Sequence, residues 1–232
     1  MNPVLSASLL AGALAADNRS SLRLMVSQPV CGGLLAGFAL GNPREGLLAG
    51  AVLQMLFLGM VPVRGIGMSD LALGGVAVSS LYILSLRSAA VDPAARGLVL
   101  LLSLGASLGV AAAGRSVYRF WESRSHVFAD AALRLAGKGR FALASALHFS
   151  TLAIHFAVGF AVMAAVVIAG VPAVAGIAGA VSGKWAEPLA SLPVLLPFIG
   201  AGSLLALNLG KVRGFLFLAG FCTVMLALVF RS

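Results

Sequence analysis

Five polar side chains interrupt the long apolar stretches of this chain, and their chemistry is the first clue to its function. They are Gln28, Gln54, Arg64, Asp70 and Asn208. A side-chain amide offers two N–H donors and an acceptor oxygen, which is the inventory needed to hold sugar hydroxyls. An interhelical hydrogen bond is the alternative role for Gln54, and helix packing is the alternative for Asn208. All of these residues except Arg64 are therefore candidate substrate-binding residues.

The stretch from residue 62 to residue 70 is the best candidate for a site. Pro62, Gly65 and Gly67 break helix geometry within it. Irregular backbone is tolerated at membrane depth only inside protein or beside a water-filled cavity. The free N–H and C=O groups of this stretch would line such a cavity, together with Gln54. The alternative is an ordinary interfacial loop whose charged side chains are solvated.

Catalysis, metal binding and disulfide formation are not expected. The sequence has no glycine-rich phosphate loop, no paired catalytic carboxylates and no nucleophile beside a base. His148 and His155 are seven residues apart on one helix face, without a carboxylate nearby. We interpret them as interhelical hydrogen-bonding groups rather than phospho-acceptors or metal ligands. Both cysteines, Cys31 and Cys222, lie in apolar stretches and are expected to be buried thiols. We expect no cofactor, no metal and no catalytic residue in this chain.

The composition identifies the environment of these residues. The chain has 232 residues, of which 60% are apolar and 10% charged, against about 45–50% and about 25% in an ordinary soluble domain. This excludes a disordered chain, a soluble enzyme of the usual kind and a basic nucleic-acid binder. An all-α polytopic membrane protein remains. The net charge of +9, from 16 Lys and Arg against 7 Asp and Glu, is then the cytoplasmic bias of basic residues.

The chain is expected to form a single integral membrane domain over residues 1–232. Residues 1–114 would contain N-terminal helices and a hairpin over 29–63, whose turn is marked by Gly41, Asn42 and Pro43. Its two arms are short for complete spans of about 20 residues. We therefore predict a re-entrant hairpin, with a pair of tilted complete spans as the alternative.

The second half of the chain begins with a basic segment at residues 115–140. Six basic and two acidic residues leave +4 there, and the positive-inside rule places the segment in the cytoplasm. Apolar residues between the charges favour an amphipathic helix on the membrane surface, and a solvated linker helix is the alternative. Residues 141–232 would form C-terminal helices. Residues 141–182 carry no charge and are predicted to divide at Gly170-Val171-Pro172, followed by helices at 189–209 and 215–230. Four to six complete spans and one or two partial ones are expected.

These motifs resemble a known family. Gln-Pro at 28–29, the Gly-Asn turn at 41–42, Gly-Ala-Val-Leu-Gln at 50–54 and a glycine-rich stretch ending at Asp70 are similar in order and spacing to motifs of one transport family. It is the IIC membrane subunit of the mannose/fructose/sorbose family of the sugar phosphotransferase system. The resemblance covers most of the chain, although its specific motifs lie within about the first 70 residues. Asn42 replaces the family's turn Asp, Arg64 stands where Gly is usual, and Ser69 replaces the Pro before Asp70.

The resemblance implies a sugar-translocating subunit in the bacterial cytoplasmic (inner) membrane. It would pair with a IID membrane subunit, assemble as a trimer of IIC–IID pairs, and pass its sugar to cytoplasmic IIA and IIB subunits for phosphorylation. Gln54 would recognise hydroxyls, Asp70 would accept sugar O–H groups or anchor the broken stretch, and Gln28 would order the hairpin. Arg64 raises an alternative, a non-transporting regulatory or docking subunit, because a fixed charge would obstruct a neutral sugar. An unrelated solute transporter would carry ionisable residues in several spans, and these are nearly absent.

Overall fold

The fold within the described residues is helical. The structure, a computed structural model, describes residues 2–19, 28–57, 71–88, 95–181 and 186–208. Seven α-helices lie within these ranges: α1 (Pro3–Arg19), α2 (Pro29–Ala39), α3 (Pro43–Leu56), α4 (Leu71–Ser88), α5 (Arg96–Gly137), α6 (Phe141–Ala180) and α7 (Ala186–Asn208). The prediction of an all-α protein with long apolar helices is thus confirmed.

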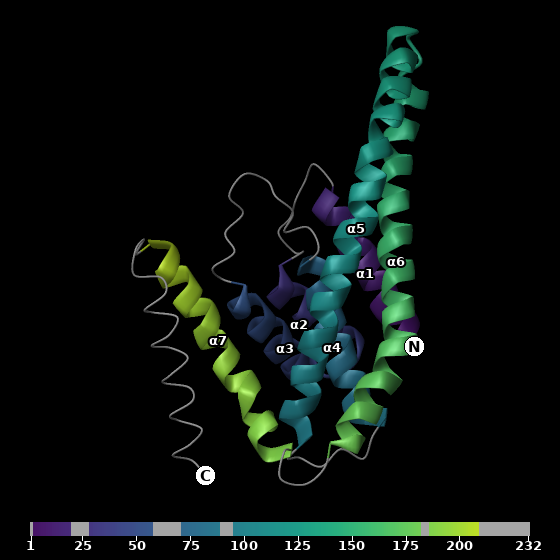
Figure 1. The fold of residues 1–232 in the computed structure, drawn as a ribbon. Coiled ribbons are helices and arrows are strands. Elements are labelled where there is room, and N and C mark those ends of the chain that lie inside the picture. Colours follow the sequence, from purple (N-terminus) through teal and green to yellow (C-terminus); the bar gives the residue numbers. More distant parts are fainter. Residues whose placement is uncertain (1, 20–27, 58–70, 89–94, 182–185, 209–232) are drawn as a thin grey trace.

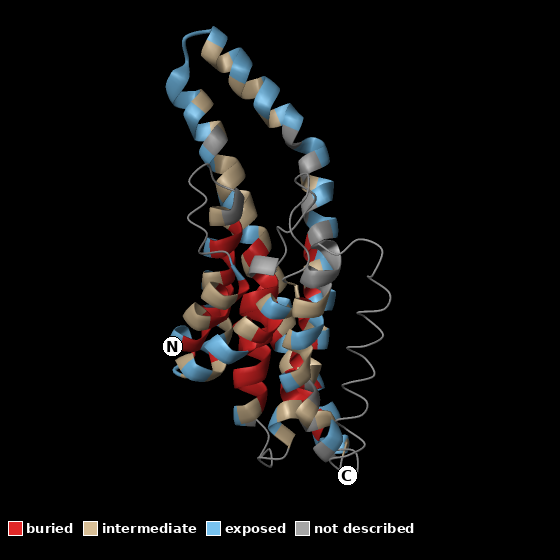
Figure 2. Ribbon diagram, turned by 90° about the vertical axis from the view of Figure 1, so that its left-hand side faces the viewer, coloured by how far each residue is buried: buried red, intermediate tan, exposed pale blue. Residues whose placement is uncertain are grey.

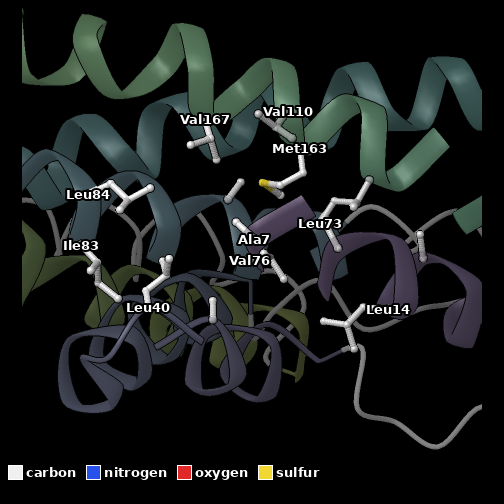
Figure 3. Close-up of a cluster of buried hydrophobic side chains, with 14 residues drawn as sticks. Ala7, Leu14, Leu40, Leu73, Val76, Ile83, Leu84, Val110, Met163 and Val167 are labelled. Atoms are coloured by element: carbon white, nitrogen blue, oxygen red, sulfur yellow. The ribbon is translucent and has the colours of Figure 1, made fainter. Parts of the chain in front are cut away.

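Helix α4 forms the centre of the bundle. It packs against α1, α2, α3, α5 and α6, and every residue from 73 to 85 is buried. On one side its side chains meet α1 and α6, where Val76 lies beside Ala7 and Met163 (Figure 3). On another side Val78 and Tyr82 join a second apolar cluster with α3 and α5. The short helices α2 and α3 are therefore held on a fixed central helix.

Helices α5 and α6 form a long antiparallel pair. Their turn contains Gly139, whose φ of 70° is the left-handed conformation that glycine adopts without strain. Residues 115–150 of this pair, here called the arm, extend beyond the bundle (Figure 1), and no described residue of the arm is buried (Figure 2). The basic segment at 115–140 is therefore the second half of α5 together with the turn, continuous with the apolar first half.

The prediction that residues 170–172 divide the uncharged stretch was wrong. Helix α6 runs from Phe141 to Ala180 without a break and contains Pro172. Pro172 has no N–H, so the helix loses the hydrogen bond to the carbonyl of residue 168, and a proline within a membrane helix is tolerated where packing supports the backbone. Here α4 packs at this point: Leu81 lies against Gly170, and the Ser85 hydroxyl donates to the Val171 carbonyl at 3.4 Å. Tertiary packing, which a local sequence pattern does not contain, keeps the helix continuous.

Two of the described helices are long and apolar enough to cross a membrane, Arg96–Trp121 within α5 and Phe141–Ala180. Four shorter apolar helices are also found: Pro3–Asp17, Pro29–Ala39, Leu73–Arg87 and Pro193–Gly202. The predicted helix at 189–209 corresponds to α7, which contains two internal prolines. The predicted helix at 215–230 lies outside the described residues. Helix α6 alone, with 40 residues, is about 60 Å long, roughly twice the hydrocarbon core of a bilayer.

Candidate functional site

The α2–α3 hairpin is built on direct backbone contact. A Cβ atom on Gly33 would lie 2.6 Å from the Gly46 carbonyl oxygen, and one on Gly50 would lie 2.5 Å from the carbonyl oxygen of Pro29. The same holds toward α4, where a Cβ on Gly75 would lie 2.6 Å from the Cα of Pro29. Glycines at these positions let three helices approach more closely than any side chain would permit. The three helices therefore form one tightly packed unit.

The turn of this hairpin is fixed at the carboxyl-terminal end of α4. Gly41 adopts a φ of 72° and reverses the chain. The Arg87 side chain of α4 donates a hydrogen bond to the Leu40 carbonyl, one of the groups that the end of α2 leaves without a helical partner. Toward the amino end of α4, the Ser79 hydroxyl donates to the Gly46 carbonyl at 3.0 Å. The polar turn is thus held at the same level as Arg87.

Gln54 connects the amino end of α2 with the carboxyl end of α3. These two ends lie opposite the hairpin turn and are here called the open ends. The Gln54 Oε1 accepts a hydrogen bond from the backbone N–H of Val30 at 3.0 Å. A backbone N–H only donates, so the facing amide atom is the oxygen, and the amide nitrogen points elsewhere. Val30 lies in the first turn of α2, where N–H groups have no helical partner. Gln54 therefore caps α2 from α3, and no hydrogen bond of its amide nitrogen is present among the described residues.

The open ends lie deep relative to the turn. Pro29 lies beside Gly75 and Leu40 beside Arg87, so α2 runs parallel to α4 over 12 residues of the latter. At 1.5 Å per residue the two levels are about 18 Å apart. The open ends therefore lie about 18 Å along α4 from the level of Arg87 and the hairpin turn. Two helices end there, one by its amino end and one by its carboxyl end.

Helix α7 packs against the carboxyl end of α3. Gly200 lies so close to the Met55 carbonyl that a Cβ atom at this position would overlap it, and Leu56 is the next neighbour. Gly200 is buried. The last turn of α3, which carries Gln54, is therefore confined between α2, α4 and α7.

The structure describes the side chains of two of the four predicted site residues, Gln54 and Gln28. Gln54 is half-buried and bridges the helices, whereas Gln28 is exposed immediately before α2 and its carbonyl accepts the Gly32 N–H at 2.8 Å. Asn208 is the last residue of α7, and its side chain is not described. Asp70 lies outside the described residues, as do Arg64 and the rest of the 62–70 stretch. Within the ranges that the structure describes, no group of His, Cys, Asp and Glu could hold a metal ion.

Comparison with known proteins decides the family. The family model described as "PTS system sorbose-specific iic component" matches residues 4–230. The chain belongs to this family. It is a mannose-family IIC component, the sugar-permease component of a phosphotransferase system. A search of the curated proteins finds no match.

The fold of this IIC component is similar to two solved structures. One is described as "Structure of membrane protein", with a TM-score of 0.68, 19% identity, and coverage of 99% of this chain and 95% of that chain. The other is a chain of "CryoEM Structure of Mannose Transporter ManYZ and Microcin E492 (MceA) complex", with a TM-score of 0.59, 17% identity, and coverage of 96% and 86%. At these identities the likeness concerns the fold, which is that of a membrane transporter.

Several residues that shape the site of the IIC component were not recognised from sequence. Gly200 and Gly75 hold α7 and α4 against the open ends, and Arg87 holds the turn. The i, i+4 spacing of Gly33 with Gly37 was a usable signal for close packing. The partners of Gly200 had no local signal, because they lie about 145 residues away in sequence.

Proposed function

We propose that this IIC component conducts a hexose or a related sugar across the bacterial cytoplasmic membrane, and that the sugar binds at the open ends of α2 and α3. One observation carries this proposal: two short helices end about 18 Å from the level of Arg87 and are joined by the Gln54–Val30 hydrogen bond. With Arg87 at the membrane boundary, these ends would lie near the middle of a hydrocarbon core about 30 Å thick. Transporters characteristically place their binding sites where discontinuous helices end near the bilayer midplane. The amide nitrogen of Gln54 supplies two donors for sugar hydroxyls at that point.

Chain connectivity supports the assignment of the other site residues. Asp70 immediately precedes α4 and lies five residues before Gly75, which packs on Pro29. Asn208 ends α7, eight residues beyond Gly200, which packs on Met55. Asp70 thus adjoins a helix that contacts the open ends, and Asn208 belongs to another such helix. We assign Asp70 as an acceptor for sugar O–H groups, and Gln28 and Asn208 as polar residues flanking the same site.

The membrane topology follows from charge and helix direction. We assign the predicted re-entrant hairpin to α2 and α3, with its turn at one membrane face and its open ends within the bilayer. Helix α5 begins at that face and ends in the arm. Residues 115–140 carry +4, whereas residues 87–96, which join α4 to α5 and contain two arginines and Asp92, carry +1. The positive-inside rule therefore places the arm in the cytoplasm and the hairpin turn at the opposite face.

The proposed partners are a IID membrane subunit and cytoplasmic IIA and IIB subunits, in a trimer of IIC–IID pairs. The family supports this arrangement, and so do the large apolar side chains that the arm exposes. Phe120 is 61% exposed, Phe141 68% and Phe149 66%. Aromatic surface of this extent is covered by lipid or by a partner subunit in a membrane protein. The cytoplasmic subunits would carry out the phosphoryl transfer.

Sugar uptake tests the proposal. A strain lacking its own mannose-type system is supplied with this chain and its IID partner, together with IIA and IIB, and uptake is measured over a panel of labelled sugars. We expect uptake of at least one hexose or related sugar, and none when this chain is omitted. The docking alternative rests on Arg64, which lies outside the described residues. It predicts no uptake of any sugar although the subunits still assemble.

A further inference from the structure

A second site lies at the opposite end of α3 from Gln54. A cavity of about 460 Å³ opens between α3 and the start of α5. It is lined by Arg44, Glu45, Leu47, Leu48, Ala51 and Arg96. We propose that this cavity binds the phosphate group of an anionic phospholipid. The proposal does not depend on the sugar site, because it rests on a different set of residues.

The charge in the cavity suits a phosphate. Two arginines and one glutamate line it, which leaves +1. The Glu45 carboxylate accepts a hydrogen bond from the buried Tyr82 hydroxyl, so its charge is directed toward α4. No hydrogen bond or ion pair of Arg44 or Arg96 is present among the described residues. The planar guanidinium group pairs with phosphate oxygens through two parallel N–H donors. Within the part of the chain that the structure describes, the cavity therefore presents two cationic forks without a hydrogen-bond partner.

The apolar wall of the cavity suits an acyl chain. Leu47 and Leu48 are 41% and 46% exposed, and Ala51 continues the same face of α3 one turn further from the arginines. The cavity therefore has a cationic end, at the level of the hairpin turn and Arg87, and an apolar wall that runs deeper along α3. A charged end at the boundary and an apolar surface below it match a phospholipid in one leaflet, because the phosphate of such a lipid lies at the interface. Since α5 begins here and ends in the arm, that leaflet is the one opposite the arm.

Lipid retention on the purified full-length chain, co-expressed with its membrane partner, tests the proposal. Native mass spectrometry measures binding of phosphatidylglycerol, with phosphatidylcholine for comparison, to the wild type and to an Arg44→Gln/Arg96→Gln double variant. We expect preferential retention of phosphatidylglycerol and a loss of about tenfold or more in the double variant. Arg44→Lys/Arg96→Lys should restore part of the binding. It would also show that a loss in the Gln variant is not a failure to fold.

Two further measurements separate this site from other sources of binding. The matched control is Arg134→Gln/Lys138→Gln, which removes the same charge from exposed positions of the arm and should leave the retained lipid unchanged. Inorganic phosphate at millimolar concentration should not displace the lipid. Displacement by phosphate would assign the cavity to a soluble phosphate and overturn the lipid proposal. Equal retention by the wild type and Arg44→Gln/Arg96→Gln would overturn it as well.

Discussion

Gly46→Ala tests the close packing of the hairpin that presents Gln54. The new methyl group would lie against the carbonyl of Gly33, 2.6 Å from the Gly37 Cα and 2.8 Å from its nitrogen. Overpacking of this kind costs about 1–3 kcal/mol. Separating the helices also weakens the Ser79 hydrogen bond to Gly46, worth about 0.6 kcal/mol. The better helix propensity of alanine returns up to about 1 kcal/mol, so a net loss of about 1–3 kcal/mol is expected.

Thermal unfolding of the purified protein measures this loss. At about 2–4 °C per kcal/mol for a chain of this size, the midpoint of Gly46→Ala should fall by roughly 2–12 °C. Gly105→Ala is the matched control, because Gly105 is a helical glycine of α5 with nothing within 4 Å of the added Cβ. Its midpoint should stay level or rise, since only the propensity term acts. If Gly46→Ala were as stable as Gly105→Ala, the direct backbone contact between α2 and α3 would be refuted.

Two other substitutions probe how the site is enclosed. Gly200→Ala should displace α7 from the Met55 carbonyl and lower sugar binding by about tenfold or more. Gly202→Ala, two residues away with nothing within 4 Å of its Cβ, should bind normally, and equal binding by both variants would contradict the packing of α7 on α3. Arg87→Met removes the donor to the Leu40 carbonyl and should lower the unfolding midpoint by about 2–4 °C, from a loss of about 1 kcal/mol. An unchanged midpoint would show that this hydrogen bond does not hold the turn.

The sequence allowed the helical class and the α2–α3 turn to be predicted, and it singled out Gln54 as a candidate, because each has a local signal. Gly41, Asn42 and Pro43 mark a reversal by their own conformational preferences, and an amide inside an apolar run stands out by its cost. The continuity of α6 through Pro172 was not predictable, because Ser85 of another helix stabilises the backbone there.

The alternative roles of Gln54 could be compared only in the folded structure. The sequence offered an interhelical hydrogen bond or sugar recognition as competing roles. The structure supplies the first through the oxygen, and sugar recognition by the amide nitrogen stays a prediction that is compatible with it. The cavity at Arg44 and Arg96 was missed for a different reason. Its two arginines lie 52 residues apart in sequence, and only the packing of α5 beside α3 brings them to one cavity.

The most direct test of the account is sugar binding by Gln54→Leu, compared with Ser79→Ala. Each variant removes one side-chain hydrogen bond that holds α3 to a neighbouring helix. Gln54→Leu removes the bond to Val30 of α2, and Ser79→Ala removes the bond from α4 to Gly46. The two bonds lie eight residues apart on α3, or about 12 Å. We predict that calorimetry on the purified IIC–IID complex will show about tenfold or greater loss of sugar affinity for Gln54→Leu, and near wild-type affinity for Ser79→Ala. Unchanged affinity in Gln54→Leu, or an equal loss in both variants, would contradict a sugar site at the open ends of α2 and α3.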